Sequence, residues 1–274
     1  MNKITFLFYF FITQISAQTG ISVSPPRVYF ESGSGSSSTQ RITVTNVSAK
    51  NSLDLAVSLG DWEYDDSGEN MMYAANTLKN SCASWISVKK SDNYFTLAPG
   101  ERKELDVTIT VPSAAKDSLS SHTALLYVSQ MNPVEDVDTN GSNIKISIRS
   151  GIKIFHKSAG AVPRKVEIQD LKFNKNKNKN KNKNNNNNNS LALQFENQSA
   201  IWVDGKISTE IINTKTGKKV LIDDIVFYTL PHDKRKITIP VGTPLEKGSY
   251  NASVMIDYGD SSTLEIGELN FNYE

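Results

Sequence analysis

Apolar and polar residues alternate along most of the chain in short runs, and this pattern predicts a protein built of β-strands. The runs are rich in β-branched and aromatic residues and are separated by clusters of Gly, Ser, Asn, Asp and Pro. No long segment places its apolar residues at the spacing of an amphipathic helix. The pattern therefore predicts an all-β fold.

A first series of predicted strands occupies residues 18–156. They are expected at residues 21–24, 27–30, 40–46, 53–62, 85–89, 94–97, 102–110, 123–130 and 143–156. About nine strands at this spacing are typical of one immunoglobulin-like β-sandwich. The turn-rich residues 136–141 are expected to join the last two strands as a hairpin.

A second series follows residues 157–164, which are small, flexible and contain Pro163, as expected of a linker between domains. Its strands are expected at residues 165–173, 191–196, 202–213, 219–226, 234–239, 250–258 and 263–273. Seven strands suffice for a second sandwich over residues 165–274. We therefore expect two β-sandwich domains.

A low-complexity tract at residues 174–189 alternates Asn and Lys and then becomes pure Asn. It falls between the first two strands of the second series, which is the position of a hairpin loop. Asn and Lys are poor strand formers that bury little apolar area. The simplest interpretation is an expanded loop, because the entropic cost of closing a loop grows slowly with its length. The alternative is that its lysines attract an anionic surface.

The net charge of the whole chain hides the mildly acidic character of the rest of the protein, because the tract contributes five lysines. The chain has 30 Lys and Arg against 29 Asp and Glu, a formal charge of +1, but without the five lysines of the tract and Lys3 the balance is −5. This gives no sign of a nucleic-acid or acidic-lipid partner. With 38% hydrophobic and 22% charged residues, the composition excludes a collagen, a wholly disordered chain and a multi-span membrane protein.

Residues 1–17 have the pattern of a cleavable signal peptide. Lys3 precedes an apolar run at residues 4–12, and the segment ends in the small residues Ser16 and Ala17. Nine apolar residues are too few to span a bilayer, although an uncleaved anchor is the alternative. We expect an exported protein without stable membrane insertion.

The sequence contains no convergent set of catalytic or metal-binding residues. His122, His156 and His232 are far apart, and Cys82 is the only cysteine, so none has the spacing of a known catalytic or zinc motif. We expect a buried, inert cysteine, structural histidines, no cofactor and no enzymatic activity.

One segment imitates a calcium loop. Asp136, Asp138, Asn140 and Gly141 match its first positions, but Ser147 stands where a bidentate glutamate is needed, and the flanks are predicted strands. A hairpin tip is the better interpretation. The acidic run at residues 61–68 is likewise interpreted as a turn between strands.

The predicted strand 143–156 is unusually long and regular. Ile144, Ile146 and Ile148 point to one side, while Lys145, Ser147 and Arg149 point to the other. Such a strand is either a core strand or an edge that pairs with another chain. Periodicity alone favours a core strand.

Several short motifs, taken in order, resemble the PapD-like periplasmic pilus-assembly chaperones. In the first half they are residues 24–30 (SPPRVYF), 97–101 (LAPGE), 124–128 (ALLYV) and 151–155 (GIKIF). In the second half they are residues 195–197 (FEN), 230–231 (LP), 245–250 (LEKGSY) and 257–259 (DYG). The resemblance covers nearly the whole chain after the predicted signal peptide.

The resemblance implies a fold and a function. The fold is two immunoglobulin-like sandwiches set at an angle with a cleft between them. The function is binding: such a periplasmic chaperone stabilises pilus (fimbrial) or adhesin subunits by donor-strand complementation and delivers them to an outer-membrane assembly protein. By resemblance, Arg27 and Lys153 bind the C-terminal carboxylate of the subunit, and Ile144, Ile146 and Ile148 are the donor-strand residues.

The chain also departs from the family pattern. His156, Lys157 and Ser158 follow Phe155 where the family usually has an aromatic residue, Arg and Pro, and the interdomain charge network is expected to shrink to Lys157 with Asp257. The alternative to a chaperone is a structural pilus or adhesin subunit. Such a subunit would carry an apolar donor extension, whereas only three residues separate the predicted signal peptide from the strand at Ile21. An enzyme or calcium-binding lectin ranks third.

Overall fold

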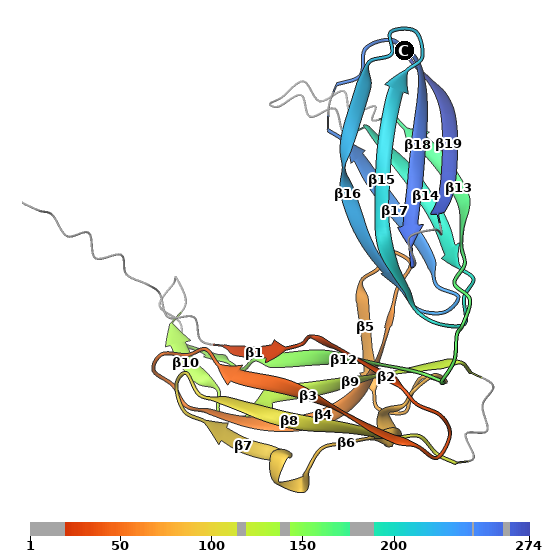
Figure 1. Cartoon of the computed structure of the whole chain (residues 1–274). Coiled ribbons are helices and arrows are strands. Elements are labelled where there is room, and N and C mark those ends of the chain that lie inside the picture. The colour runs from red at the N-terminus through yellow and green to blue at the C-terminus, as the bar shows by residue number, and fades with distance from the viewer. Residues whose placement is uncertain (1–19, 114–118, 138–142, 176–188, 243, 260–263) are drawn as a thin grey trace, which may run out of the picture.

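The structure is a computed structural model that describes residues 20–113, 119–137, 143–175, 189–242, 244–259 and 264–274. These residues form two β-sandwiches set at an angle to each other (Figure 1), which confirms the predicted fold class. The predicted signal peptide and residues 176–188 of the Asn/Lys tract lie outside the described residues. In the part that is described, no helix is long and apolar enough to cross a membrane.

The first sandwich is built from two sheets. One sheet has the order β1 (Ile21–Ser24), β3 (Ser37–Asn46), β8 (Arg102–Thr110) and β6 (Ile86–Ser87). The other has the order β2 (Arg27–Glu31), β12 (Arg149–Lys157), β9 (Ser121–Gln130), β4 (Leu53–Tyr64) and β5 (Asn70–Ala74), with β7 (Tyr94–Leu97) also paired to β4. Short 3-10 turns at Ala83–Trp85 and Lys90–Asp92 flank β6, so the strand predicted at 85–89 is shorter than expected.

Strand β9 shows why the two domains stay together. Its alternate residues Leu126 and Val128 face the core of the first sandwich, whereas Leu125 and Tyr127 face the other way and are also buried. The second face is covered by residues of the second domain. The resulting interdomain cluster consists of Trp62, Leu125, Tyr127, Phe155, Ile201, Trp202 and Leu230.

The long strand predicted at residues 143–156 is in fact two strands. β11 (Asn143–Ile146) pairs only with β10 (Val134–Val137), and the chain leaves the ladder at Ser147 and Ile148 before β12 begins. The Ser147 hydroxyl donates a hydrogen bond to the Gln130 carbonyl at 2.7 Å, and the Gln130 amide donates to the Ile148 carbonyl at 2.8 Å. In the sequence, isoleucines continue to alternate with other residues on both sides of this break, so the pattern could not predict it.

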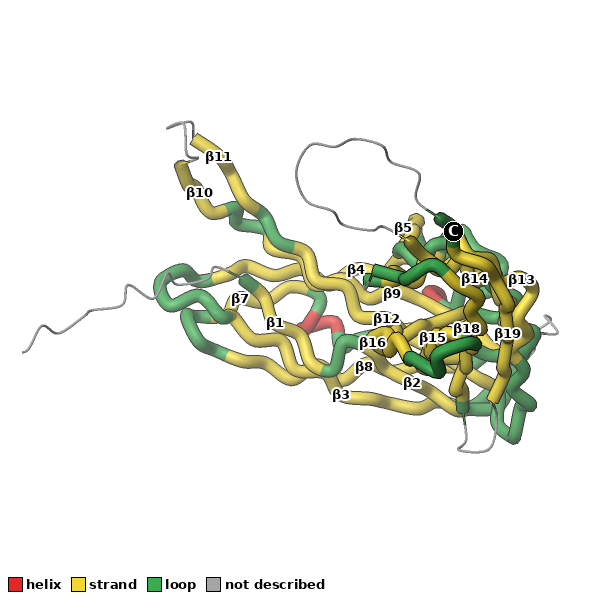
Figure 2. The backbone as a smooth tube through the Cα atoms, turned by 90° about the horizontal axis from the view of Figure 1, so that it is seen from above, coloured by secondary structure: helices red, strands yellow, loops and turns green. Residues whose placement is uncertain are grey.

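Strands β10 and β11 form a ribbon that stands out from the first sandwich (Figure 2). The predicted hairpin of strands 123–130 and 143–156 is confirmed by the antiparallel pairing of β9 with β12, and β10 and β11 extend it. The sequence predicted no strand at β10, and residues 136 and 137, which were expected in the turn, belong to that strand. Asp136 lies in β10 opposite Ile144, so the imitation calcium loop is flanked by strands, as expected.

The second sandwich contains all seven predicted strands. One sheet has the order β13 (Val166–Asn174), β14 (Asn189–Asn197) and β17 (Lys234–Val241). The other has the order β16 (Lys219–Thr229), β15 (Val203–Asn213), β18 (Gly248–Tyr258) and β19 (Leu264–Tyr273). Because β13 and β14 pair antiparallel, the Asn/Lys tract connects two strands of a hairpin, as predicted.

The hairpin of β4 and β5 links the domains a second time. It rises from the first sandwich to the base of the second (Figure 1). At its tip, the Lys236 amide of β17 donates a hydrogen bond to the Asp66 carbonyl at 2.8 Å, and the Lys236 and Asp66 side chains form an ion pair at 2.6 Å. The space between this hairpin and β17 holds the candidate site.

Candidate functional site: a cationic cleft lined by tyrosines

Arg27 and Lys153 lie directly side by side. The parallel ladder of β2 and β12 begins with this pair, since Lys153 is the register partner of Arg27. The two residues are far apart in the sequence, and only the pairing of the second predicted strand with the last strand of the first series brings them together. Their alternate neighbours Val28, Ile152 and Ile154 are buried in the core, so both cations point to the opposite face, toward the second domain.

Lys153 is partly buried among neutral groups. Its Nζ donates hydrogen bonds to the Tyr64 hydroxyl at 2.9 Å and to Asn70 Oδ1 at 2.6 Å. It also lies 4.1 Å from the centre of the Trp62 ring and 4.2 Å from that of Tyr64. Burial, with the nearby charges of Arg27 and Arg235, lowers the pKa of Lys153 to about 8. Among the described residues, no carboxylate forms an ion pair that would compensate the charge of this ammonium group.

Arg27 is stacked on an aromatic ring of the other domain. Its guanidinium carbon lies 3.8 Å from the centre of the Tyr228 ring, a cation–π arrangement across the cleft. None of the ion pairs found among the described residues includes Arg27 or Lys153. Both cations thus rest on neutral aromatic and amide groups.

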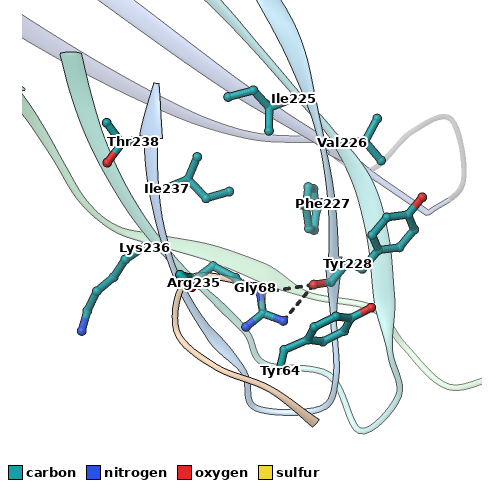
Figure 3. A pocket seen from close by; sticks show the side chains of 11 residues that line it. Tyr64, Gly68, Ile225, Val226, Phe227, Tyr228, Arg235, Lys236, Ile237 and Thr238 are labelled. Carbon is teal, nitrogen blue, oxygen red and sulfur yellow. Dashed lines mark hydrogen bonds between the residues drawn. The ribbon is translucent and has the colours of Figure 1, made fainter. Parts of the chain in front are cut away.

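Arg235 of β17 is a third cation, which the sequence did not single out. It is 2% exposed and donates hydrogen bonds to the Tyr228 carbonyl at 2.9 and 3.2 Å (Figure 3). It also donates to Asp233 at 2.9 Å and to the Asp65 carbonyl. Its guanidinium carbon lies 4.6 Å from the centre of the Tyr64 ring. Arg235 therefore holds Tyr64 and Tyr228 in place on the wall of the cleft.

Asp233 is the acidic partner of Arg235. Burial raises the pKa of Asp233 to about 6, although the Leu230 amide and the Arg235 guanidinium both act to lower it. The pair is thus partly desolvated. The Asp233 carboxylate is paired with Arg235, and among the described ion pairs it compensates neither Arg27 nor Lys153.

The acidic run at residues 61–68 contributes more than the predicted turn. Trp62 and Tyr64 lie on one face, as predicted, with ring centres 5.0 Å apart and an edge-to-face angle of 84°. The sequence did not predict that they would cover Lys153, nor that Asp66 would bind the second domain. The available signal was two aromatic residues followed by two aspartates at a turn, which is too common to identify an interdomain contact.

The predicted donor-strand isoleucines do not share one strand. Ile146 lies in β11 opposite Val134 and is 40% exposed, whereas Ile148 is half-buried in the break between β11 and β12. Ile144 lies in β11, and its side chain is outside the described part of the structure. The break at Ser147 and Ile148 separates the isoleucines of β11 from Lys153. The predicted binding residues are therefore divided between the β10–β11 ribbon with the break that follows it and strand β12 in the cleft.

The ion pair predicted between Lys157 and Asp257 is not among those formed by the described residues. Lys157 instead pairs with Glu31 at 3.0 Å. The parallel ladder makes these two residues register partners at the ends of β12 and β2, so a carboxylate of the same domain is the nearer one. The two domains are instead joined by the interdomain cluster and the tip of the β4–β5 hairpin.

The remaining chemistry-bearing residues have structural surroundings. Cys82 is fully buried, and burial strongly raises the pKa of its thiol, as expected of an inert cysteine. His122 and His156 are buried, and both rings pack against Trp85. Across the described ranges, no three His, Cys, Asp or Glu side chains gather as a metal site would require.

Comparisons with known proteins gave structural similarities only. No family model and no curated protein sequence matches the chain. Among solved structures, the chain is similar to the chaperone DraB of E. coli, with 17% identity over 93% of this chain and 96% of that one and a TM-score of 0.45.

Two further similarities are of the same kind. A chain from the complex of the Salmonella enterica SafA pilin with the SafB chaperone has 15% identity, coverage of 92% and 97%, and a TM-score of 0.43. The Pseudomonas aeruginosa CupB2 chaperone has 12% identity, coverage of 90% and 98%, and a TM-score of 0.42. At such low identities and TM-scores these similarities assign no residue a role, and the functional argument rests on the site itself.

Proposed function

We propose that this protein is an exported, periplasmic chaperone that binds pilus (fimbrial) or adhesin subunits by donor-strand complementation. The observation that carries the proposal is the Arg27–Lys153 pair, two adjacent cations at a domain junction with no acidic partner among the described ion pairs. Arg27 lies on β2 and Lys153 on β12, and the chain that precedes β12 is the isoleucine-bearing strand β11 of the ribbon. A subunit would bind with its C-terminal carboxylate at the cations and its incomplete sandwich against this segment.

The carboxylate fits the cationic cleft for electrostatic reasons. In the free protein, Lys153 donates to two neutral acceptors, the Tyr64 hydroxyl and the Asn70 amide oxygen. A carboxylate would replace them with charge-assisted hydrogen bonds, which are stronger, and Arg27 offers a planar fork of donors beside them. Each such bond stabilises a complex by ~1.5–3 kcal/mol.

Strand β12 also has an edge to which a subunit strand can add. β9 pairs with β12 along Arg149–Lys157, whereas the ladder with β2 covers only Lys153–Lys157. Residues 149–152 therefore have a ladder partner on one side only. On its other side, the Ser150 hydroxyl donates a hydrogen bond to the Ile21 carbonyl of β1 at 3.4 Å, although β1 is paired with β3 and not with β12. A strand edge without a ladder partner accepts backbone hydrogen bonds from another chain. The open edge ends at the cations, so the carboxylate would set the register of the added strand.

The isoleucines would contribute the apolar part of the binding energy. Ile146 is 40% exposed in the free protein, so a bound subunit can bury the remainder of its side chain. Full burial of such a side chain is worth ~1.5–3 kcal/mol. In this proposal the isoleucines fill the groove of an incomplete subunit, and an outer-membrane assembly protein then receives the complex.

The test is co-expression with secreted proteins encoded nearby, followed by pull-down of the periplasmic fraction. Arg27→Ala and Lys153→Ala should each reduce subunit recovery strongly. Lys89→Ala is the matched control, because Lys89 is an exposed cation of the same domain whose partner is Asp106. Equal recovery with all three variants would refute the carboxylate anchor.

A second experiment addresses export. Intact-mass measurement of the purified periplasmic protein should give the mass of a chain that starts after Ala17. A full-length mass, or recovery only from the cytoplasm, would contradict the proposed location.

A further inference from the structure

A pocket of about 400 Å³ opens beside the two cations, at the base of the second sandwich. Figure 3 shows its apolar walls, with Ile225 and Phe227 from β16 facing Ile237 from β17. Arg235 and Tyr64 lie at its lower end. The pocket is thus built by both domains, since Tyr64 belongs to the β4–β5 hairpin.

The pocket exists because two sheet edges meet there without pairing. β16 is the last strand of one sheet and β17 the last strand of the other. Phe227 is buried in the core of the second sandwich, whereas Ile225 and Ile237 are only half-buried and pack at its margin. The gap between the strands is therefore an apolar entrance into a sandwich core.

Two wall residues of the pocket are the residues on which the cations rest. Tyr64 accepts a hydrogen bond from Lys153, and Tyr228 lies beneath the guanidinium of Arg27. A group held by Arg27 and Lys153 is therefore next to the pocket. Of the described residues that line the pocket, none is acidic, and Arg235 and Lys236 are the charged ones, each paired with an aspartate outside the lining.

We propose that this pocket holds the side chain of the C-terminal residue of the bound subunit, and that it selects a large apolar or aromatic residue there. The inference rests on the proposed function, because the carboxylate at the cations is what places the last side chain at the entrance. The apolar walls favour burial of such a side chain. The guanidinium of Arg235 disfavours a basic residue and is well placed to lie against an aromatic ring.

The experiment uses the full-length mature protein and synthetic peptides of alternating apolar and polar residues that differ only at the last position. One set ends in Phe, Leu, Gly or Lys with a free carboxylate, and a second set ends in the same residues as amides. We expect the free acids ending in Phe or Leu to bind at least about tenfold more tightly than those ending in Gly or Lys, measured by calorimetry. All amides should bind weakly.

Variants then separate the pocket from the anchor. Ile237→Trp fills the pocket from β17 and should abolish the preference for Phe while leaving the affinity for the peptide ending in Gly unchanged. Ile225→Trp fills it from β16 and should behave in the same way, so one unstable variant does not decide the result. Leu221→Trp is the matched control, because Leu221 lies on β16 outside the pocket and is 77% exposed.

Two outcomes would overturn the inference, and they are distinguishable. Equal affinity for peptides ending in Phe and Gly, with both lost in Lys153→Ala, would refute the pocket and leave the chaperone function standing. Binding that is the same for acids and amides, and unchanged by Lys153→Ala, would refute the proposed function and the pocket with it.

Discussion

The two halves of the segment at residues 143–157 have the same side-chain alternation but different surroundings. β12 lies between β9 and β2, and its residues Ile152 and Ile154 are buried in the core of the first sandwich. β11 is held only by β10, and Ile146 is 40% exposed. β12 is thus part of the scaffold of the first sandwich, whereas β11 is accessible to another chain.

This difference teaches that alternation identifies a strand and its two faces but not its neighbours. The isoleucines of β12 are buried in the core and stabilise this protein, whereas Ile146 of β11 is 40% exposed. Lys153 stands at the beginning of the doubly paired part, where β2 joins the ladder. The paired half of the segment, β12, thus carries Lys153, and the other half, β11, carries the exposed Ile146.

The largest expected effect is on stability. Ile154→Ala removes a fully buried side chain from the core and should lower the free energy of unfolding of the first domain by ~2–5 kcal/mol. Ile146→Ala, the same change in β11, should alter it by less than ~0.5 kcal/mol. Chemical denaturation followed by tryptophan fluorescence measures both. Similar losses for the two variants would mean that β11 belongs to the folded core.

The second-largest expected effect is a change at Ile146 that weakens binding and leaves stability unchanged. Ile146→Asp should weaken subunit binding at least about tenfold, because a charge cannot enter an apolar groove. The free energy of unfolding should stay within ~0.5 kcal/mol of the wild-type value. Met131→Asp is the control, since Met131 is 55% exposed near the root of the ribbon and lies outside the isoleucine pattern. Wild-type affinity of Ile146→Asp would remove β11 from the binding site.

The next prediction is the pH dependence of carboxylate binding, and it concerns Lys153 in β12. With a pKa of about 8, its ammonium is largely charged at pH 7 and largely neutral at pH 9, so affinity for a carboxylate should fall by up to about tenfold over this range. Lys153→Arg, which stays charged, should remove most of this fall. Equal pH profiles for wild type and Lys153→Arg would show that Lys153 does not bind the carboxylate.

Stability should change in the opposite direction. Unfolded Lys153 keeps its proton up to its ordinary pKa of 10.5, whereas folded Lys153 releases it near pH 8. Between these values the unfolded state binds more protons, so the contribution of Lys153 to stability rises with pH. Comparing denaturation curves of wild type and Lys153→Met across this range isolates that contribution. A contribution that falls with pH would contradict the lowered pKa.

The smallest expected effect is at the far end of β12. A double-mutant cycle of Lys157→Ala and Glu31→Ala should give a small favourable coupling, because the Glu31 side chain is 52% exposed and solvent screens the pair. The cycle of Lys157→Ala with Asp257→Ala should give none. Coupling of Lys157 to Asp257 alone would restore the original sequence-based prediction.

Much of the fold could be predicted because β-strands have a local signature. Turn residues and period-two alternation located all seven strands of the second sandwich and the hairpin that contains the Asn/Lys tract. β5 was missed because its residues Asn70–Ala74 are mostly exposed and do not alternate. It exists as a strand because β4 extends to Tyr64 and pairs with it.

The candidate site was only partly predictable. Arg27 and Lys153 were singled out by resemblance to a family, and the structure brings them together as register partners. Arg235, Tyr228 and Asn70 carry no sequence signal of their own, because each matters only through a neighbour from a distant part of the chain. Such neighbours are set by packing between the domains.

The sequence by itself determined most of the strands, their two faces and the presence of two sandwiches, because these depend on residues close together along the chain. Only the tertiary structure decided where the ladder breaks, which cations lack an acidic partner and which side chains wall the pocket. These features depend on which strands become neighbours and on what remains uncovered once the interdomain cluster has formed. The alternation of residues along a strand predicts which side chains share a face. Which of these side chains are buried, paired with a charge or accessible depends on the elements that pack against each face.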